Sequence, residues 1–423
     1  MQKPAILGGR PIIESHPSAP LRWPILGKAE ARAIQRVLSH GDLSCHPVTR
    51  DLERSYRRRT GRRLALAHCN GTAALTASFF ALNLQPGDEV LVPSATFWAS
   101  VVPMLWFGLL PVFCESDPER LGLDPADVES KITGRTRAMV VVHLFGMPSR
   151  MTPLLEIARR HGLKIVEDAS HAHGAMWRGR PCGSLGDVSV FSLQTSKLAP
   201  AGEGGMLLTD DEEIFRRSVC MGDMMRILEL EGPERRFAGT TFGMKTRMAP
   251  LSAAIAECQL RQLDRRNLRR RENLEYLSSK LERLGFETYL PPPHVERTYF
   301  EFVIRPRAEK VDLPAALLVR ALSAEGCQAS HARYPLLHQQ PLFTEGAFQN
   351  IARVDRPEGL PQYLPDALPR TQRLRSELVT LPAFPRADRR LLDRYVDAFE
   401  KVLGAADQIR KNHQEPILTG AER

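Results

Sequence analysis

The sequence predicts an α/β fold with a mixed, mostly parallel sheet in a large domain, followed by a smaller α+β domain. Strand-like and helix-like segments alternate between residues 64 and 208, which is typical of parallel sheets with helical crossovers. The chain has 423 residues, and one hydrophobic core usually stops growing below that size, so two domains are expected. The composition, 43% hydrophobic and 25% charged, is that of a globular protein.

Short apolar runs bounded by turn residues give the expected strands of the large domain: 64–68, 89–92, 112–114, 138–142, 164–166, 188–191 and 205–208. Helices are expected between them, at 72–84, 153–161 and 249–284. After three consecutive prolines at 291–293 the pattern changes to a strand at 300–304 and helices at 313–325 and 389–403. The resulting division is an N-terminal arm (1–30), a large domain (31–285), a small C-terminal domain (286–405) and a disordered tail (406–423).

Several classes of protein find no support in the sequence. An apolar run long enough to span a membrane is absent, and the first residues lack the apolar core of a secretion signal. The seven cysteines are scattered and odd in number, which favours reduced thiols in a cytoplasmic protein. Neither a Cys-x-x-Cys pair nor a His-Glu-x-x-His motif occurs, so we expect no metal site.

The formal net charge is +9, and two arginine-rich runs at 57–63 and 264–271 carry much of the excess. Such runs occur at nucleic-acid-binding surfaces, but also on solvated helices of proteins that attract an anionic ligand. Glu272 and Glu275 continue the second run at helical spacing, and no aromatic residues interleave with either run. We therefore favour the second interpretation and expect neither nucleic acid nor membrane as a partner.

Lys197 and Asp168 are the most informative pair of residues. Asp168 ends a predicted strand, and Lys197 lies about one supersecondary unit later in a polar loop that leads to Gly202-Glu203-Gly204-Gly205. Pyridoxal phosphate (PLP) needs these two groups: a lysine amine that holds its aldehyde, and a carboxylate that keeps its pyridine nitrogen protonated. The pair indicates a PLP enzyme.

Other candidate residues also follow strands, where ligands bind in open α/β sheets. Asn70-Gly71-Thr72 lies where a strand turns into a helix, which suits a phosphate, although Asn or Thr at this place can simply cap the helix. Ser192 follows the strand at 188–191 and could donate to the same phosphate. Phe97 could stack on a planar ligand or could belong to the core. His171, three residues after Asp168, could contact the same ligand.

Taken together, these motifs resemble the DegT/DnrJ/EryC1/StrS family of PLP-dependent sugar aminotransferases. The resemblance extends from about residue 21 to residue 403. It implies the fold of the type I PLP enzymes, like aspartate aminotransferase. The motifs that carry it are Gly71-Thr72-Ala73-Ala74-Leu75, Pro86-Gly87-Asp88-Glu89-Val90, Val142-His143-Leu144-Phe145-Gly146, Val166-Glu167-Asp168-Ala169, His173-Gly174-Ala175, Gly183-Ser184-Leu185-Gly186-Asp187, Phe191-Ser192, and Lys197 with Gly202-Glu203-Gly204-Gly205.

The resemblance implies a role for each residue around the PLP ring. Lys197 would hold the PLP aldehyde and then move a proton between the substrate carbon and the cofactor. Asp168 would bind the pyridine nitrogen, Phe97 would stack on the ring, and His171 would lie beside the ring hydroxyl.

The same resemblance implies a phosphate site built by Gly71, Thr72 and Ser192. In the family an asparagine from the neighbouring subunit completes this site, and Lys245 stands at its position here, in Lys245-Thr246-Arg247-Met248. A lysine can bind a phosphate as a point charge. The resemblance therefore also implies a homodimer with a shared active site.

Relatives that deoxygenate ketosugars have histidine at the position of Lys197, so lysine favours transamination. Glu203, and Arg333 with Tyr334 in the family's substrate-side loop, would contact the substrate. The expected reaction moves an amino group from an amino acid, glutamine or glutamate, to a keto-cyclitol or free ketosugar in secondary metabolism, such as antibiotic biosynthesis. A nucleotide-linked ketosugar aminotransferase, a dehydrating enzyme like the aminohydroxybenzoate synthases, and a PLP-binding regulator stay open as alternatives.

Overall fold

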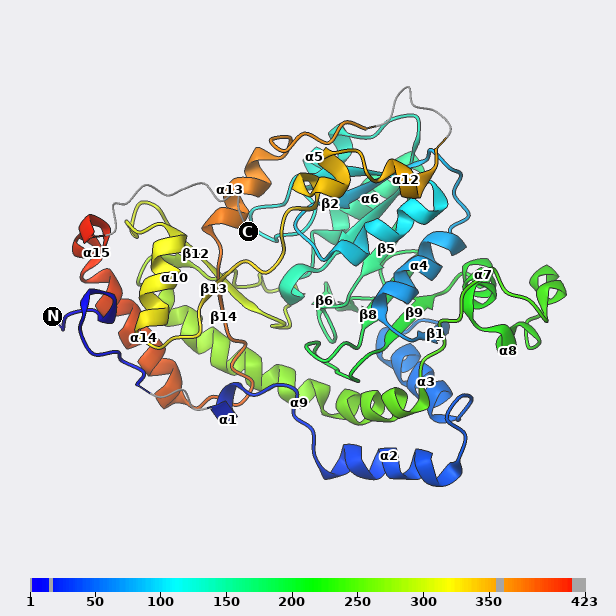
Figure 1. Cartoon of the computed structure of the whole chain (residues 1–423), viewed down its shortest axis with the longest axis horizontal. Coiled ribbons are helices and arrows are strands. Elements are labelled where there is room, and N and C mark those ends of the chain that lie inside the picture. Colours follow the sequence, from blue (N-terminus) through cyan, green and yellow to red (C-terminus); the bar gives the residue numbers. More distant parts are fainter. Residues whose placement is uncertain (1, 15–17, 355–360, 413–423) are drawn as a thin grey trace.

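The computed structural model describes residues 2–14, 18–354 and 361–412. Its largest sheet has seven strands in the order β1-β9-β8-β5-β4-β2-β3 (Figure 1). Their bounds are β1 Leu64–His68, β2 Glu89–Pro93, β3 Leu110–Cys114, β4 Thr136–Val142, β5 Lys164–Asp168, β8 Val188–Ser192 and β9 Gly205–Thr209. Strands β8, β5, β4, β2 and β3 pair in parallel, whereas β9 is antiparallel to both of its neighbours. The predicted fold class, a mixed and mostly parallel sheet, is confirmed.

Helices cover both faces of this sheet (Figure 1), and nearly all residues of its strands are buried. The helices in the first two thirds of the chain are α1 Ser18–Leu21, α2 Lys28–His40, α3 Val48–Thr60, α4 Gly71–Ala81, α5 Pro125–Ser130, α6 Met151–His161, α7 Glu212–Gly222, α8 Met224–Ile227 and α9 Pro250–Leu281, with short 3₁₀ turns η1 Ala5–Leu7, η2 Trp98–Ser100, η3 Val102–Phe107, η4 Leu144–Gly146 and η5 Pro233–Phe237. Their apolar faces and the strands form the main core.

A second, antiparallel sheet has the order β10-β12-β14-β13. Its strands are β10 Phe286–Glu287, β12 Phe302–Pro306, β13 Ser330–His331 and β14 Val379–Leu381. Short strands β6 Met176–Trp177, β7 Arg180–Pro181 and β11 Val295–Glu296 form a third sheet. The C-terminal helices are α10 Ala315–Ala324, η6 Leu337–Gln339, α11 Pro341–Thr344, α12 Gln349–Ala352, α13 Pro369–Glu377, α14 Arg389–Leu403 and α15 Ala406–Asn412. Helices α10 and α14 and the second sheet enclose their own core.

Helix α9 connects the two parts of the molecule (Figure 1). Its 32 residues span about 48 Å at the usual helical rise. Leu260 and Leu263 in its first half belong to the core beside the large sheet, and Leu274 and Leu277 in its second half belong to the core of the second sheet. Groups carried by the middle of α9 therefore face the junction between the two parts.

The tail differs from its prediction. Residues 406–412 form helix α15 rather than a disordered segment, because Ile409 is fully buried in the core of the second sheet. The sequence does not predict this helix, because the stretch is mostly polar and Ile409 is its one fully buried residue. The remainder of the predicted tail, 413–423, lies outside the described residues.

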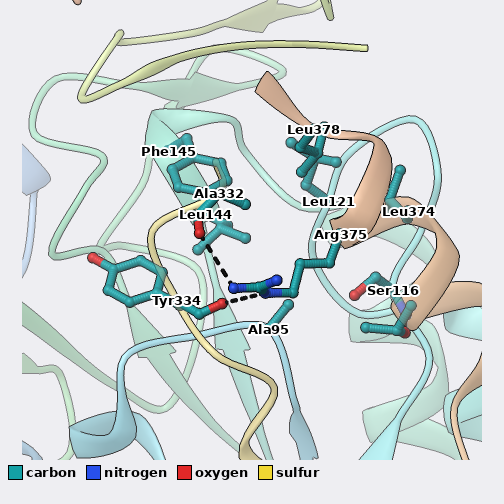
Figure 2. Close-up of a pocket in the computed structure, with 11 residues that line it drawn as sticks. Ala95, Ser116, Leu121, Leu144, Phe145, Ala332, Tyr334, Leu374, Arg375 and Leu378 are labelled. Atoms are coloured by element: carbon teal, nitrogen blue, oxygen red, sulfur yellow. Dashed lines mark hydrogen bonds between the residues drawn. The ribbon is translucent and has the colours of Figure 1, made fainter. Parts of the chain in front are cut away.

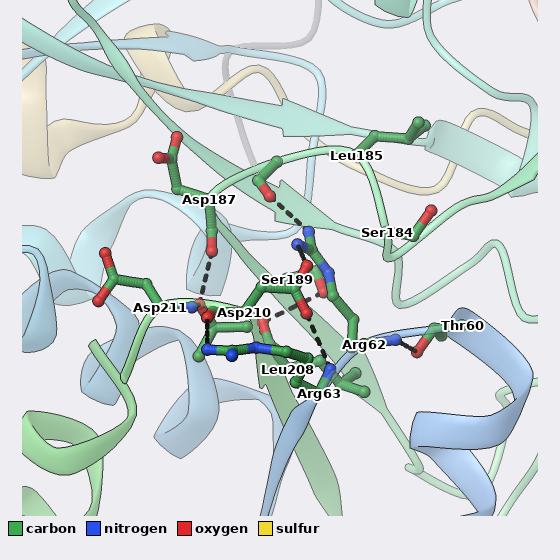
Figure 3. Close-up of polar contacts among 12 residues, drawn as sticks. Thr60, Arg62, Arg63, Ser184, Leu185, Asp187, Ser189, Leu208, Asp210 and Asp211 are labelled. Atoms are coloured by element: carbon green, nitrogen blue, oxygen red, sulfur yellow. Dashed lines mark hydrogen bonds and ion pairs between the residues drawn. The ribbon is translucent and has the colours of Figure 1, made fainter. Parts of the chain in front are cut away.

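The arginines of the first basic run contact their own chain. Arg62 is buried and donates to the carbonyls of Gly183 and Gly186 and to the carboxylate of Asp210, which also accepts the Arg63 N–H at 2.8 Å (Figure 3). Arg59 forms a two-pronged pair with Asp264. These contacts fix the end of α3 against the loop before β8. Much of the positive charge in this run is thus used within the fold.

Within the described residues, no helix has the length and apolar character needed to cross a bilayer.

Candidate active site

The predicted site residues gather at the carboxyl ends of β5 and β8, which are neighbours in the large sheet. Asp168 is the last residue of β5 and Ser192 the last of β8. Lys197 lies in the loop that follows β8 and turns back into β9. Adjacent parallel strands end at the same edge, so residues 29 positions apart along the chain meet there.

Lys197 is buried, with 9% of its surface exposed. Its backbone is fixed by a hydrogen bond from its N–H to the Gln194 carbonyl (2.8 Å) and by the Trp23 indole N–H, which donates to the Lys197 carbonyl (3.0 Å). The Nζ atom lies 4.6 Å from the centre of the Phe300 ring. Burial lowers the pKa of the Lys197 amine to about 8, although the nearby Asp168 carboxylate opposes this shift. About a tenth of the amine is therefore neutral, and so nucleophilic, at pH 7, far more than for an ordinary lysine.

The Asp168 carboxylate is held by donors on both oxygens. The Ser100 hydroxyl donates to Oδ2 at 2.7 Å, and the Ser170 backbone N–H donates to Oδ1 at 3.0 Å. Ser100 is itself within 3.2 Å of the Thr96 hydroxyl. These contacts fix the orientation of a buried acceptor that faces the same space as Lys197.

His171 lies in the turn after β5 and is held from both ring nitrogens. The Phe145 backbone N–H donates to Nδ1 at 3.3 Å, which assigns the ring proton to Nε2, 3.1 Å from the Tyr334 hydroxyl. The ring also stacks on Phe300, with centroids 4.1 Å apart. Burial, followed by the charges of Lys197 and Arg333, holds the pKa of His171 well below its usual value, so the ring is neutral.

Gly71 brings the start of helix α4 against Ser192. A Cβ atom at position 71 would lie 2.8 Å from the Cβ of Ser192, so only glycine allows this approach. Asn70 caps the helix by accepting the Ala73 N–H at 2.7 Å, which is the capping role that the sequence left open. The free N–H groups at the first turn of α4, Thr72 and the Ser192 hydroxyl thus form one polar corner suited to an anion.

Phe97 and Tyr334 face each other across the mouth of this region, with ring centroids 6.1 Å apart. Phe97 is 44% exposed and therefore does not belong to the core. Arg375 of α13 holds the loop that carries Tyr334: its Nε donates to the Tyr334 carbonyl at 2.7 Å and its Nη2 to the Ala332 carbonyl at 3.4 Å (Figure 2). The position of Tyr334 beside His171 thus depends on a contact with a distant helix.

Comparison with known proteins identifies the family of this arrangement. The family model of the DegT/DnrJ/EryC1/StrS aminotransferases matches residues 24–400. The chain belongs to this family. It is therefore an aminotransferase, and the resemblance seen in its motifs is confirmed.

Two curated relatives and one solved structure show what the chain is similar to. The chain is 34% identical over 397 residues to an L-glutamine:2-deoxy-scyllo-inosose aminotransferase of Streptomyces kanamyceticus, covering 90% of this chain and 93% of that protein. It is 34% identical to the GDP-perosamine synthase of Caulobacter vibrioides, covering 71% and 80%. The structure of a 3-amino-5-hydroxybenzoic acid synthase matches with a TM-score of 0.77 and 26% identity over 90% of this aminotransferase and 98% of that chain.

Two of the predicted site residues of this aminotransferase lie apart from the pair formed by Lys197 and Asp168. Lys245 is exposed, next to Thr246, whose carbonyl accepts the Cys69 N–H at 2.6 Å. Glu203 is exposed in the loop between Lys197 and β9, close enough to Cys69 that its charge, after burial, helps to raise the pKa of that thiol. Both residues thus lie near the β1–α4 turn rather than beside Asp168.

Glu301 and Phe300 are site residues that the sequence did not reveal. Glu301 is buried and pairs with Arg333, one of the predicted substrate residues, while its Oε2 atom has no hydrogen-bond partner. Burial raises the pKa of Glu301, and the neighbouring Arg333 and Lys197 charges oppose this shift. Both residues precede β12, and no local motif marks them, because their proximity to Lys197 depends on how the two sheets meet.

The described residues also include a buried group of metal-binding side-chain types: His143, Glu167 and Cys182. Glu167 accepts the backbone N–H groups of Gly183, Leu185 and Gly186 together with the His143 ring nitrogen at 2.9 Å. The Ser149 N–H occupies the other nitrogen of His143 at 3.1 Å. The oxygens of Glu167 and the ring nitrogens of His143 are thus engaged in hydrogen bonds within the chain. These bonds connect β5, which ends at Asp168, to the loop before β8.

Proposed function

We propose that this aminotransferase uses PLP to move an amino group from an amino acid, glutamine or glutamate, to a keto-cyclitol or ketosugar. The observation that carries the proposal is the burial of the Lys197 amine next to the Asp168 carboxylate, with the polar corner at Gly71 and Ser192 at the same sheet edge. These groups match the three parts of PLP: aldehyde, pyridine nitrogen and phosphate. When bound, PLP supplies a ring that withdraws electrons from the substrate C–H bond.

We assign the roles from the family resemblance together with the positions of the side chains. Lys197 holds the cofactor and carries the proton to and from the substrate carbon, and Asp168 accepts a hydrogen bond from the protonated ring nitrogen. Phe97 covers the ring, and His171, whose Nε2–H points to Tyr334, lies beside it. Gly71, Thr72 and Ser192 bind the phosphate. We assign Glu203, Arg333 and Tyr334 to substrate binding.

Support for the acceptor comes from the names of the relatives, which include a scyllo-inosose-type aminotransferase that uses glutamine. We therefore favour a keto-cyclitol, in the cytoplasmic biosynthesis of an aminocyclitol antibiotic. GDP-perosamine synthase, equally identical over a shorter stretch, supports a nucleotide-linked ketosugar as the second candidate.

The first test follows the absorbance spectrum of the PLP-loaded protein while single amino donors are added, beginning with glutamine and glutamate. The proposal requires conversion of the cofactor to its amine form, with release of the matching keto acid. If PLP binds covalently but no amino acid converts it, transamination is excluded. Dehydration of the kind named for the benzoic acid synthase then becomes the better candidate.

The lowered pKa of Lys197 predicts how fast the PLP-free protein captures PLP at different pH values. Only the neutral amine reacts, so the rate should rise about tenfold per pH unit below pH 8 and level off above it. Stopped-flow absorbance measures the rate. A midpoint near 10.5, the ordinary lysine value, would contradict the burial of this amine.

We further propose that the enzyme is a homodimer in which the partner's copy of residue 245 completes the phosphate site. The segment from 224 to 245, which ends at Lys245, carries several exposed apolar side chains, an unusual surface for a free monomer. They are Met224, Met225, Leu228, Phe242 and Met244, and Phe97 and Trp98 at the site mouth are exposed as well. A second subunit packed on this surface would cover these residues and bring a cation to the polar corner at Gly71.

Mixing two inactive variants tests the shared site. Lys197→Ala and Lys245→Glu subunits should each be inactive alone, the second because a carboxylate repels the phosphate. Random mixed dimers should regain about a quarter of the wild-type activity, since half of the dimers contain one intact site of two. The exposed Lys310 provides the control, because Lys310→Glu should leave activity unchanged. If the mixture stays inactive although each parent folds and the subunits exchange, residue 245 does not act across an interface.

A further inference from the structure

A cavity of about 640 Å³ lies beside the loop that carries Lys197, and Phe300 lines it. It lies where the N-terminal segment, helix α9 and the second sheet meet, and Thr195 and Ser196 of the Lys197 loop also line it. This volume is within the range of small-molecule sites. The side chains on its wall that matter here are Trp23, Arg270, Phe300, Glu301 and Arg333.

Arg270, from the middle of α9, is the unusual member of this wall. Only 3% of its surface is exposed, and its Nε and Nη1 atoms have no hydrogen-bond partner. Its guanidinium stacks on the Trp23 ring, with the Cζ atom 4.1 Å from the ring centre. Burial lowers the pKa of Arg270 to about 9, so it still carries its charge at neutral pH. An unpaired buried cation is costly, which indicates that an anion belongs beside it.

The neighbouring arginine of the same helix shows the contrast. Arg266, one turn earlier, also lies over Trp23, but its guanidinium donates to the Gln259 side chain and to the Ile25 carbonyl at 3.1 Å. The donors of Arg266 are used within the chain, whereas those of Arg270 are not. The position on α9 alone therefore does not explain why Arg270 lacks a partner.

The charges around the cavity define the kind of anion. Arg333 is paired with Glu301, so those two charges cancel. Among the residues that line the cavity, Arg270 then leaves one unbalanced positive charge. One guanidinium matches one carboxylate in both charge and geometry, whereas a nucleoside diphosphate would leave negative charge uncompensated.

We propose that Arg270 is a specificity-determining residue that binds a carboxylate of the amino-acid donor in this cavity. The inference rests on the proposed function, because it assigns the donor of that reaction. Trp23 links the two locations: its ring stacks on Arg270, and its indole N–H holds the carbonyl of Lys197. A carboxylate bound by Arg270 is thereby adjacent to the loop that presents the reactive amine.

Binding of two unreactive probes to the PLP-loaded enzyme, measured by calorimetry, tests the proposal. Glutaramate is glutamine without its α-amino group, and glutaramide replaces the remaining carboxylate by an amide. Wild-type enzyme should bind glutaramate more tightly than glutaramide. Arg270→Gln should weaken glutaramate binding about 10- to 100-fold, the usual value of a charged hydrogen bond, and leave glutaramide unaffected. Arg270→Lys should recover part of the loss, and the matched Arg266→Gln variant should bind glutaramate normally.

Three results would overturn the assignment. One is equal affinity of wild-type enzyme for glutaramate and glutaramide, which needs no variant to fold. Another is unchanged glutaramate binding in a folded Arg270→Gln variant. A third is selective loss of uridine diphosphate binding in that variant, which would make this a nucleotide site. Because glutaramate has no amino group to transfer, failure of this test is distinct from failure of the donor to convert the cofactor.

Discussion

Replacing Lys197 by alanine is expected to lower kcat for transamination by about 10⁴-fold, the upper end of what a positioned proton carrier contributes. Lys197 is the buried amine beside Asp168, and burial has already lowered its pKa to about 8, close to the working pH of a general acid–base group. Alanine removes both the covalent attachment of the cofactor and the proton carrier. Water cannot replace either function, because the amine lies under Phe300 in a site with little solvent access.

Two further variants test whether Lys197 acts through its positive charge or through its reactive amine. Lys197→Arg keeps the positive charge, but a guanidinium does not lose its proton near neutral pH, so this variant should be as inactive as alanine. Lys164→Ala, which removes an exposed lysine from the start of β5, should leave activity intact. Borohydride reduction and mass spectrometry should place PLP on a peptide containing Lys197 in the wild type and on none in Lys197→Ala. A reducible adduct together with full activity in Lys197→Ala would exclude this lysine.

The parts of the site that sequence predicts are those set by local pattern and sheet topology. Strand β1 and helix α14 have the predicted bounds, and β8 differs by one residue. Asp168 and Lys197 meet because β5 and β8 are adjacent parallel strands, an arrangement that follows once the alternating pattern is recognised.

The parts that sequence does not predict depend on contacts between distant segments. Arg270 belongs to the arginine-rich run 264–271, whose sequence predicts a solvated helix face. In the structure, however, Trp23 from the N-terminal segment covers this arginine. The Glu301–Arg333 pair joins the residue before β12 to the loop after β13. Propensity and periodicity describe neighbours along the chain, so they cannot distinguish a buried arginine from its exposed neighbours within one charged run.

Replacing Asp168 by asparagine tests whether a negative charge beside the ring nitrogen of the cofactor is needed for catalysis. Asparagine has nearly the same shape and can still accept from one of the two donors, the Ser100 hydroxyl or the Ser170 N–H. It cannot balance the charge of a protonated ring nitrogen, so the bound ring becomes a weaker electron acceptor. Loss of a charge-assisted hydrogen bond, worth about 1.5–3 kcal/mol, predicts a roughly 10- to 100-fold fall in kcat.

The decisive comparison is with Ser100→Ala, which removes one donor to Asp168 but keeps the carboxylate. Its effect should be well below that of Asp168→Asn if the charge of the carboxylate matters, and similar if only its orientation matters. Covalent attachment of PLP to Lys197, measured by reduction and mass spectrometry, should survive in both variants, because the amine that forms the bond is unchanged. An Asp168→Asn enzyme with wild-type kcat would mean that another group protonates the ring. It would also leave the buried carboxylate at the end of β5 with a purely structural role.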